Sequence, residues 1–324
     1  MPAAHEDLPH PVPPLAYLRW KENWFFIAMD PVDEVYGVVH FNFEPGFERA
    51  RYSCRLSVRG ELYEHTVEAP FPAEFAFARA IGLENFALRI SGPPSRFELA
   101  VSARDFTLEL VFDQGRPVFD FASCRSANPD MPSFQEVMTL GTNLPYNHQQ
   151  QAMRVHGSVR TAGAAAGALV PVSGYGYRDH SWCVRSDAGV ASHFWCAFHF
   201  GDRAFGVKEI HTRARPAVWA REGYVSDAEG ERVLRSMEFH REGSSSEGLP
   251  AILRVHLKDL FGRAYTVHCD VANRYAQVPL LSEKPGSQGV YHLTENFCPC
   301  RLEETGAKGC ALVEIGSAGG SSGS

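Results

Sequence analysis

The side chains with the most chemical potential lie in one short run, residues 174–185, which reads Gly-Tyr-Gly-Tyr-Arg-Asp-His-Ser-Trp-Cys-Val-Arg. Within it, residues 178–182 bring a guanidinium, a carboxylate, an imidazole and an indole close together. Such groups are costly to bury without partners. Mixed with aromatic rings, they are typical of the wall of an enclosed, partly polar pocket. We therefore predict that this run lines a functional site.

As a strand, this run would place Arg178, His180 and Trp182 on one face and Asp179 on the other. Two arrangements remain open. In one, Asp179 supports the structure by pairing with Arg178 or another cation, because a buried guanidinium needs a carboxylate. In the other, Asp179 itself faces the ligand. The predicted catalytic residues are Asp179, His180, Trp182 and Arg178.

The motifs favour acid–base chemistry without a cofactor. The chain has no G-x-S-x-G elbow, no dinucleotide fingerprint, no Walker motif and no H-E-x-x-H pair. We expect no metal, although His180, His193 and His199 with Glu209 would form a set that zinc accepts. A carboxylic acid or imidazolium in a low-dielectric pocket can protonate a C=C bond or a departing hydroxyl. Aromatic faces can then stabilise the resulting cation, so this chemistry favours a hydrophobic substrate.

More candidate ligand-binding residues flank this run. Residues 193–199 would present two histidines and a tryptophan on one face. If this segment paired with residues 178–182, the imidazoles and indoles would share one site. The predicted substrate-binding residues are Tyr175, Tyr177, His193, Trp195, His199, Glu209, His211, His148 and Gln151.

The elements that position these residues are predicted to be strands. Period-two alternation, punctuated by Gly, Pro and Asp about every 8 to 12 residues, is the all-β pattern, and only residues 136–140 favour a short helical turn. We predict two β-domains, 1–145 and 146–315, and a Gly/Ser-rich tail at 316–324 that is typical of a linker. Barrels or sandwiches would protect the many strand edges. The predicted strands are 35–43, 51–59, 86–90, 96–101, 106–112, 154–159, 192–200, 204–212, 218–225, 232–239, 251–257, 264–271 and 310–315.

The composition excludes several classes. The 324 residues carry a net charge of −7 without a basic stripe, which argues against nucleic acid. No apolar run approaches the roughly 18 residues that span a bilayer, and residues 1–14 lack the hydrophobic core of a secretory signal. The eight cysteines include one Cys298-Pro-Cys300 pair and are expected to be reduced, buried thiols. We expect a cytoplasmic protein.

Two segments together resemble the carotenoid 1,2-hydratase (hydroxyneurosporene synthase) and AttH-like superfamily of double lipocalin-like proteins. Residues 174–185 are close to its glycine-rich Arg-Asp-His-Ser-Trp-Gly signature, and residues 148–157 are similar to the His…Gln…Arg-Val-x-Gly stretch before it. Residues 20–30 and 309–314 resemble its first and last strands. Where the superfamily has a glycine after the tryptophan, this chain has the bulkier Cys183.

The resemblance implies two consecutive lipocalin-like antiparallel barrels with a ligand cavity at or near their interface. It also implies His180 and Trp182 at the active centre, with Asp179 and Arg178 beside them. Members of the superfamily include cofactor-independent hydratases and cyclases of terpenoid or polyketide chains.

We therefore expect a cofactor-free hydratase or dehydratase, isomerase or cyclase that acts on a terpenoid- or steroid-like small molecule. The alternatives are a non-catalytic carrier of a lipophilic ligand and a pericyclase-like enzyme that folds a polyene without proton transfer.

Overall fold

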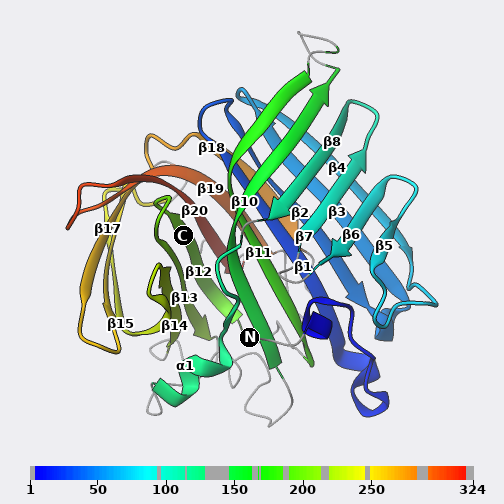
Figure 1. Ribbon diagram of the computed structural model, residues 1–324, viewed down its shortest axis with the longest axis horizontal. Coiled ribbons are helices and arrows are strands. Elements are labelled where there is room, and N and C mark those ends of the chain that lie inside the picture. Colours follow the sequence, from blue (N-terminus) through cyan, green and yellow to red (C-terminus); the bar gives the residue numbers. More distant parts are fainter. Residues whose placement is uncertain are drawn as a thin grey trace, which may run out of the picture. The chain divides into compact units, whose positions relative to one another are not determined.

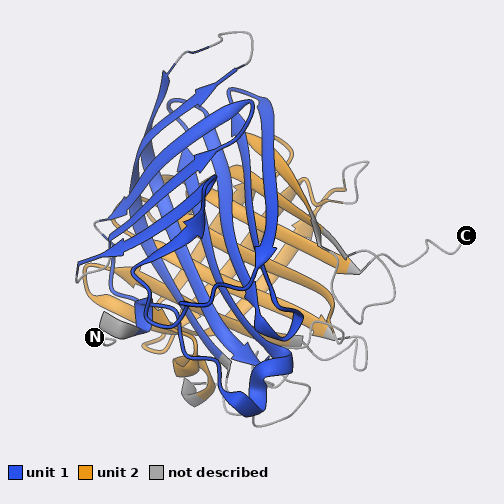
Figure 2. Cartoon of the chain, turned by 90° about the vertical axis from the view of Figure 1, so that its right-hand side faces the viewer, with its two compact units in different colours: residues 1–118, 147–184 blue, residues 119–146, 185–324 orange. Residues whose placement is uncertain are grey.

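The computed structural model describes residues 4–92, 96–113, 115–127, 146–162, 167, 169–184, 190–212, 219–244, 249–282 and 291–318. They form two antiparallel sheets with short helical turns (Figure 1). The chain divides into two compact units, residues 1–118 with 147–184 and residues 119–146 with 185–324 (Figure 2). The all-β prediction is confirmed.

The first unit contains one open sheet in the order β4-β3-β2-β1-β11-β10-β8-β7-β6-β5. Its N-terminal segment holds the 3-10 turns η1 (Ala4–Asp7) and η2 (Pro14–Arg19), and η3 (Pro45–Phe47) joins two strands. The strands are β1 (Trp20–Asp30), β2 (Val35–Glu44), β3 (Arg49–Val58), β4 (Glu61–Pro70), β5 (Ala80–Leu83), β6 (Phe86–Ser91), β7 (Arg96–Ser102), β8 (Phe106–Asp113), β10 (Tyr146–Thr161) and β11 (Leu169–Val184).

The long strands β10 and β11 lie in the middle of this first sheet, between β1 and β8. The sequence placed these residues in the second domain, which was predicted to begin at residue 146. The difference has a physical reason. One edge of β1 pairs with β2, and its other edge pairs with β11 over ten register positions, from Trp20↔Val184 to Met29↔Tyr175. The local alternation of a sequence does not indicate which distant strands pair with each other.

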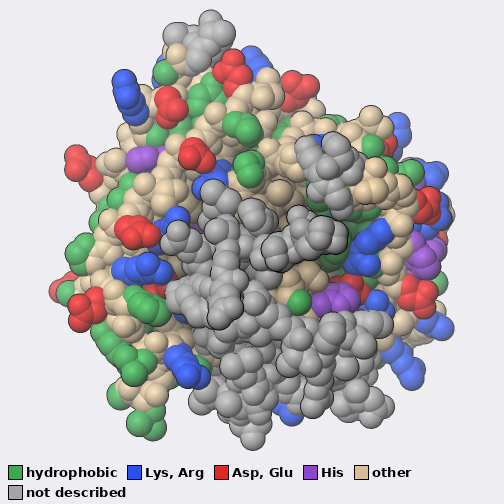
Figure 3. Space-filling view, turned by 180° about the vertical axis from the view of Figure 1, so that it is seen from behind, with side chains coloured by type: hydrophobic (Ala, Val, Ile, Leu, Met, Phe, Trp, Pro, Cys, Tyr) green, Lys and Arg blue, Asp and Glu red, His purple; other side chains and the backbone are tan. Residues whose placement is uncertain are grey.

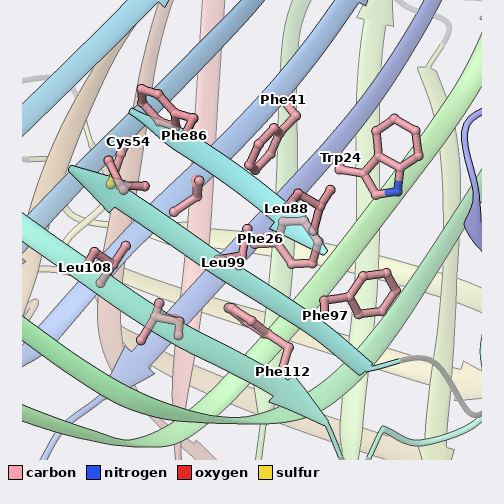
Figure 4. Packing of buried hydrophobic residues seen from close by; sticks show 14 of the residues in the cluster. Trp24, Phe26, Phe41, Cys54, Phe86, Leu88, Phe97, Leu99, Leu108 and Phe112 are labelled. Carbon is pink, nitrogen blue, oxygen red and sulfur yellow. The ribbon is translucent and has the colours of Figure 1, made fainter. Parts of the chain in front are cut away.

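Aromatic rings fill the interior face of the first sheet. Trp24, Phe26, Phe41, Phe97 and Phe112 point into one cluster from strands far apart in the sequence (Figure 4). The ring centroids of Phe26 lie 5.3 Å from Phe97 and 5.2 Å from Phe112, in tilted arrangements favourable for aromatic pairs.

This cluster explains why glycine alternates with tyrosine at the start of the 174–185 run. A Cβ atom on Gly176 would lie 2.7 Å from the Phe112 ring, and one on Gly174 would lie 2.2 Å from the carbonyl oxygen of Met29. The tyrosines at 175 and 177 point to the opposite face. The glycines therefore permit close packing at this place.

Replacing Gly176 with Ala is expected to lower the free energy of unfolding by about 1–3 kcal/mol, because the new methyl group overpacks against Phe112. Urea denaturation followed by tryptophan fluorescence measures this. The double change Gly176→Ala with Phe112→Leu should recover part of the loss. An unchanged midpoint for the single variant would contradict the packing argument.

The second unit contains a closed barrel. Its sheet runs β17-β16-β15-β14-β13-β12-β20-β19, with β18 beyond β19, and pairing of β17 with β19 closes the ring. The unit also holds β9 (Phe119–Asp120) and α1 (Ala122–Ala127). The strands are β12 (Val190–His199), β13 (Ala204–Thr212), β14 (Trp219–Asp227), β15 (Gly230–Glu242), β16 (Ile252–Asp259), β17 (Ala264–Asp270), β18 (Ala276–Ser282), β19 (Tyr291–Leu302) and β20 (Lys308–Ala318).

The cysteines behave as predicted: all eight are free and buried. Cys298 and Cys300 of the Cys-Pro-Cys pair lie in the core of the closed barrel, together with Cys196 and Cys269. Burial is the largest cause that raises the pKa of each of these thiols, so they act as small apolar side chains.

Each predicted strand overlaps a strand of the structure, whereas β4, β5, β9, β18 and β19 were not predicted. The strand β20 extends to Ala318, so it takes in the beginning of the tail that was expected at residue 316. The helical turn predicted at 136–140 lies outside the described residues. None of the described helices is both long and apolar enough to cross a bilayer. Acidic and basic side chains are interspersed over the coloured part of the face in Figure 3.

Candidate functional site

Strand β11 carries the predicted catalytic residues on two faces. In the register with β1, Phe26 stands opposite Arg178, Phe25 opposite Asp179 and Trp24 opposite His180. Because side chains alternate along a strand, His180 shares the face of Trp24 and of the aromatic core, and Asp179 points the other way. Asp179 and His180, although adjacent in sequence, therefore belong to two separate groups of side chains, one on each face of β11.

The first group, the His180 group, is centred on a buried carboxylate that joins two imidazoles. His180 Nε2 lies 3.0 Å from Glu22 Oε1, and His10 Nδ1 lies 2.8 Å from the same oxygen. The backbone N–H of His10 also donates to Glu22. The His180 ring stacks on Trp24 at 4.2 Å, and the His10 ring stacks on Trp182 at 4.0 Å. His180 and Glu22 have no exposed surface.

Burial shifts the pKa values of Glu22 and His180 in this group. It is the largest cause that raises the pKa of Glu22 well above its usual value, and the backbone N–H of His10 only partly opposes it. Burial also lowers the pKa of His180 well below its usual value, and the positive charge of Arg178 adds to this. Burial therefore disfavours the charged form of both groups, the carboxylate of Glu22 and the imidazolium of His180.

Arg178 also lies on this face, where it pairs with Asp7 of the N-terminal segment. Its guanidinium is fully buried and sits 5.3 Å from the centre of the Phe97 ring. Alternation directs the side chain of Asp179 to the opposite face of β11, away from that of Arg178.

The second group, the Asp179 dyad, lies on the other face of β11. His148 Nε2 is 2.5 Å from Asp179 Oδ2, and the side-chain amide of Gln150 donates to the same oxygen at 2.8 Å. His148 and Gln150 are both buried, whereas the Asp179 side chain keeps 13% of its surface exposed. A carboxylate fixed in this way orients an imidazole and stabilises its protonated form, which is the arrangement used in general acid–base catalysis.

The alternation of β10 explains how this dyad forms. His148 and Gln150 point to the face of Asp179, while Gln149 and Gln151 point to the other face. Gln151, predicted to bind substrate, donates to the carbonyl of Arg116 at 2.7 Å and so supports the chain locally.

The sequence patterns did not single out Gln150, His10 or Glu22 as site residues. The run of three glutamines beside His148 was the available signal for Gln150. For His10 and Glu22, no local motif exists, since only the fold brings them to His180.

Tyr175, Tyr177 and Cys183 of β11 lie on the same face as Asp179. Tyr177 is fully buried, and Tyr175 packs under the guanidinium of Arg154, 5.1 Å from its ring centre. Cys183, which stands where the related superfamily has glycine, is buried on the same face.

The residues predicted on the 193–199 segment belong to the second unit, whereas β11 belongs to the first. The pairing considered from the sequence does not occur, since β12 pairs with β13 and β20 in the second sheet, while β11 pairs with β1 and β10 in the first. His193 forms a hydrogen bond with Glu314, and His199 Nδ1 accepts from the backbone of Gly201 at 3.2 Å. Trp195 is buried nearby on β12.

Glu209 and His211 belong to an ion-pair cluster in the second unit. Glu209 is buried and accepts from Arg221 at 2.6 Å, from Arg241 at 2.7 Å and from His211 at 3.1 Å. Burial acts to raise its pKa, but these hydrogen bonds outweigh it and lower the pKa. A carboxylate held ionised by two guanidiniums is poorly suited to give up or take up a proton.

The metal-ligand set weighed from the sequence is divided between the two units, since His180 lies in the first and His193, His199 and Glu209 lie in the second. A different group has suitable spacing: one ligand atom each of His10, Glu22 and His180 lies within 4.8 Å of the others. Two imidazoles and a carboxylate suit zinc. Direct hydrogen bonds of 2.8 and 3.0 Å already join these atoms.

A family model described as a domain of unknown function (DUF7064) matches residues 3–318. No match was found among curated proteins.

Three solved structures are similar in fold. An AttH-like protein from Nitrosomonas europaea has 16% identity and a TM-score of 0.63, covering 96% of this chain and 93% of its own. Kievitone hydratase from Nectria haematococca has 12% identity and a TM-score of 0.59, with 94% and 93% covered. CghA, solved with Sch210972, has 10% identity and a TM-score of 0.58, with 95% and 90% covered. These proteins belong to the superfamily that the sequence motifs resembled, so the expected fold of two lipocalin-like domains is confirmed.

Proposed function

The chain belongs to the DUF7064 family, and we propose that it is a cofactor-independent acid–base enzyme acting on a small molecule. The observation that carries this proposal is the Asp179 dyad, in which one carboxylate oxygen holds both the His148 ring and the Gln150 amide. Two buried neighbours fix that oxygen, so the imidazole is held in one orientation before any ligand arrives.

In this proposal His148 exchanges a proton with the substrate, and Asp179 stabilises the imidazolium that forms. Gln150 acts as a positioning residue, because it donates to Asp179 and has no exposed surface. The partial exposure of Asp179 favours this dyad over His180, which is enclosed by Trp24, Trp182 and His10. Arg178, His180 and Trp182 would then hold β11 and the N-terminal segment in place.

The reaction class that fits is hydration or dehydration, isomerisation or cyclisation, since each needs only a proton donor and acceptor. The likeness in fold to kievitone hydratase supports this choice. We still predict a terpenoid- or steroid-like substrate, bound with help from Tyr175 and Tyr177. A cytoplasmic location also stays a prediction. A pericyclase-like reaction is the second candidate, favoured by the likeness to CghA, which was solved with Sch210972.

Mass spectrometry of small molecules that co-purify with the protein would identify a ligand, and turnover of that ligand in D2O tests the mechanism. If the reaction is a hydration, an isomerisation or a cyclisation, we expect a product that carries deuterium from the solvent at a carbon atom, because His148 exchanges its proton with water between turnovers. A dehydration instead removes a proton from carbon, and a deuterium label at that carbon of the substrate should then be released into the solvent. Turnover with neither uptake nor release of label at carbon would contradict the acid–base proposal and support a pericyclase-like reaction. A ligand that is returned unchanged would indicate a carrier.

A further inference from the structure

A row of buried polar residues crosses the second sheet. Glu295 of β19 stands directly opposite Glu314 of β20, and Glu314 stands opposite Trp195 of β12. The row continues to Lys208 of β13 and Glu222 of β14. Residues directly opposite each other in an antiparallel sheet point to the same side, so these side chains form one continuous row.

The row lies on the side of the sheet away from the barrel core. Cys196 and Val313, the residues next to Trp195 and Glu314 along their strands, belong to that core, and alternation sends the row the other way. All of its members are nevertheless buried: Glu295 has no exposed surface and Lys208 has 3%. Ionisable groups in such a place need partners.

At one end of the row the charges are matched. Lys208 Nζ lies 3.8 Å from Glu222 Oε2 and 3.3 Å from the centre of the Phe121 ring, which favours its positive charge. Glu222 therefore compensates Lys208, and Trp195 separates this ion pair from the two carboxyl groups at the other end.

At that other end, two carboxyl groups face each other. Glu314 forms a hydrogen bond with His193. Neither oxygen of Glu295 has a hydrogen-bond donor among the described residues. A fully buried carboxylate without a donor, next to a second carboxylate, is strongly unfavourable. A carboxylic acid at Glu295 removes the problem, because its O–H can donate to Glu314. Burial first, and the charge of Glu314 second, raise the pKa of Glu295 well above its usual value.

We propose that Glu295 and Glu314 bind one shared proton at neutral pH and form a second acid–base centre, with His193 as the group through which the proton is exchanged. The ligand of this site is the proton itself. In the exchange, the O–H bond of Glu295 breaks as an O–H bond to Glu314 forms, Glu314 passes a proton to His193 Nε2, and His193 releases one to water; uptake is the reverse. The pair lies in the second unit, so the proposal is independent of the Asp179 dyad.

The exposure of the three side chains favours exchange from Glu295 through Glu314 and His193 to the solvent. The side chains of Glu314 and His193 keep 12% and 13% of their surface exposed, whereas Glu295 keeps none. Among the described residues of this unit, the other charged groups along the row are Lys208 and Glu222, which compensate each other. On β18, the residue opposite Glu295 is the uncharged Val278.

Infrared spectroscopy of protein with ¹³C-labelled glutamate carboxyl groups tests the proposal at pH 7. Protonated glutamic acid has a C=O band separate from that of carboxylate, and we expect two such groups, Glu295 and Glu22. Glu295→Gln should remove one band and Glu22→Gln the other. Absence of any protonated-glutamate band in the wild-type protein would overturn the proposal, and so would a spectrum that Glu295→Gln leaves unchanged.

The pH dependence of unfolding gives a second test. The raised pKa means that folded Glu295 keeps its proton while the unfolded chain releases it above about pH 4.3. Stability is therefore lost as pH rises towards the folded pKa. Relative to Glu295→Gln, the unfolding equilibrium constant of the wild-type protein should rise about tenfold per pH unit from pH 5 upward. The exposed Glu304→Gln is the matched control and should run parallel to the wild type. Parallel curves for Glu295→Gln and the wild type would overturn the proposal.

Discussion

Replacing Asp179 with Asn is expected to lower turnover by about 10²- to 10⁴-fold, the contribution typical of a positioned acid–base group. The substitution keeps the size of the side chain but removes the negative charge 2.5 Å from His148 Nε2. The imidazolium then loses its stabilising partner, and an amide nitrogen in that position would favour the wrong tautomer. Single-turnover kinetics with the identified substrate measures the loss, and binding of the substrate should change little.

A matched control exists in the same unit. Asp113 also lies beside a histidine, with 3.7 Å between its Oδ1 and His156 Nδ1, but that pair is more exposed and Asp113 also pairs with Arg96. Asp113→Asn should leave turnover unchanged. His148→Ala should resemble Asp179→Asn, and the double variant should be no slower than either single variant, because the two residues act as one unit. Full activity in Asp179→Asn would remove the dyad from the mechanism.

Replacing Arg232 with Met is expected to cost about 3–5 kcal/mol of unfolding free energy, as breaking a buried ion pair does. Arg232 donates to both oxygens of Asp227, at 2.8 and 2.6 Å, and its Nε donates to Asp259 at 3.1 Å. All three side chains are buried, and they tie together the ends of β14 and β16 at the beginning of β15. Without the guanidinium, two carboxylates stay buried with too few partners. Chemical denaturation at pH 7 measures the loss.

The pH dependence of this loss has a definite sign. The hydrogen bond from Arg232 is the largest cause that lowers the pKa of Asp227 in the folded protein. A depressed folded pKa gives stability that is present above the unfolded value of about 3.9 and is lost as pH falls through the folded pKa. The difference between wild type and Arg232→Met should therefore be smaller at pH 3 than at pH 7.

Arg263→Met is the control for this experiment, because Arg263 pairs with Glu229 at a similar distance, 2.8 Å, but at the surface. Exposed pairs contribute little to stability because solvent screens them, so this variant should unfold close to the wild type. Equal losses in the two variants would contradict the assignment of Arg232 as a buried structural centre.

The sequence by itself determined the class of fold and the importance of one strand. Alternation and turn residues identified most of the strands because the side-chain period of a strand is local. The Arg-Asp-His-Ser-Trp run drew attention to β11, and alternation alone assigned Asp179 and His180 to opposite faces of that strand.

Only the tertiary structure decided which partners these residues have. His148 reaches Asp179 because β10 lies beside β11 in the first sheet, and Glu22 and His10 reach His180 through β1 and the N-terminal segment. The same strand order placed β12 in the second sheet and brought Glu295 opposite Glu314. Strand order depends on contacts between residues far apart in the chain, and those contacts are not encoded in the spacing of neighbouring residues.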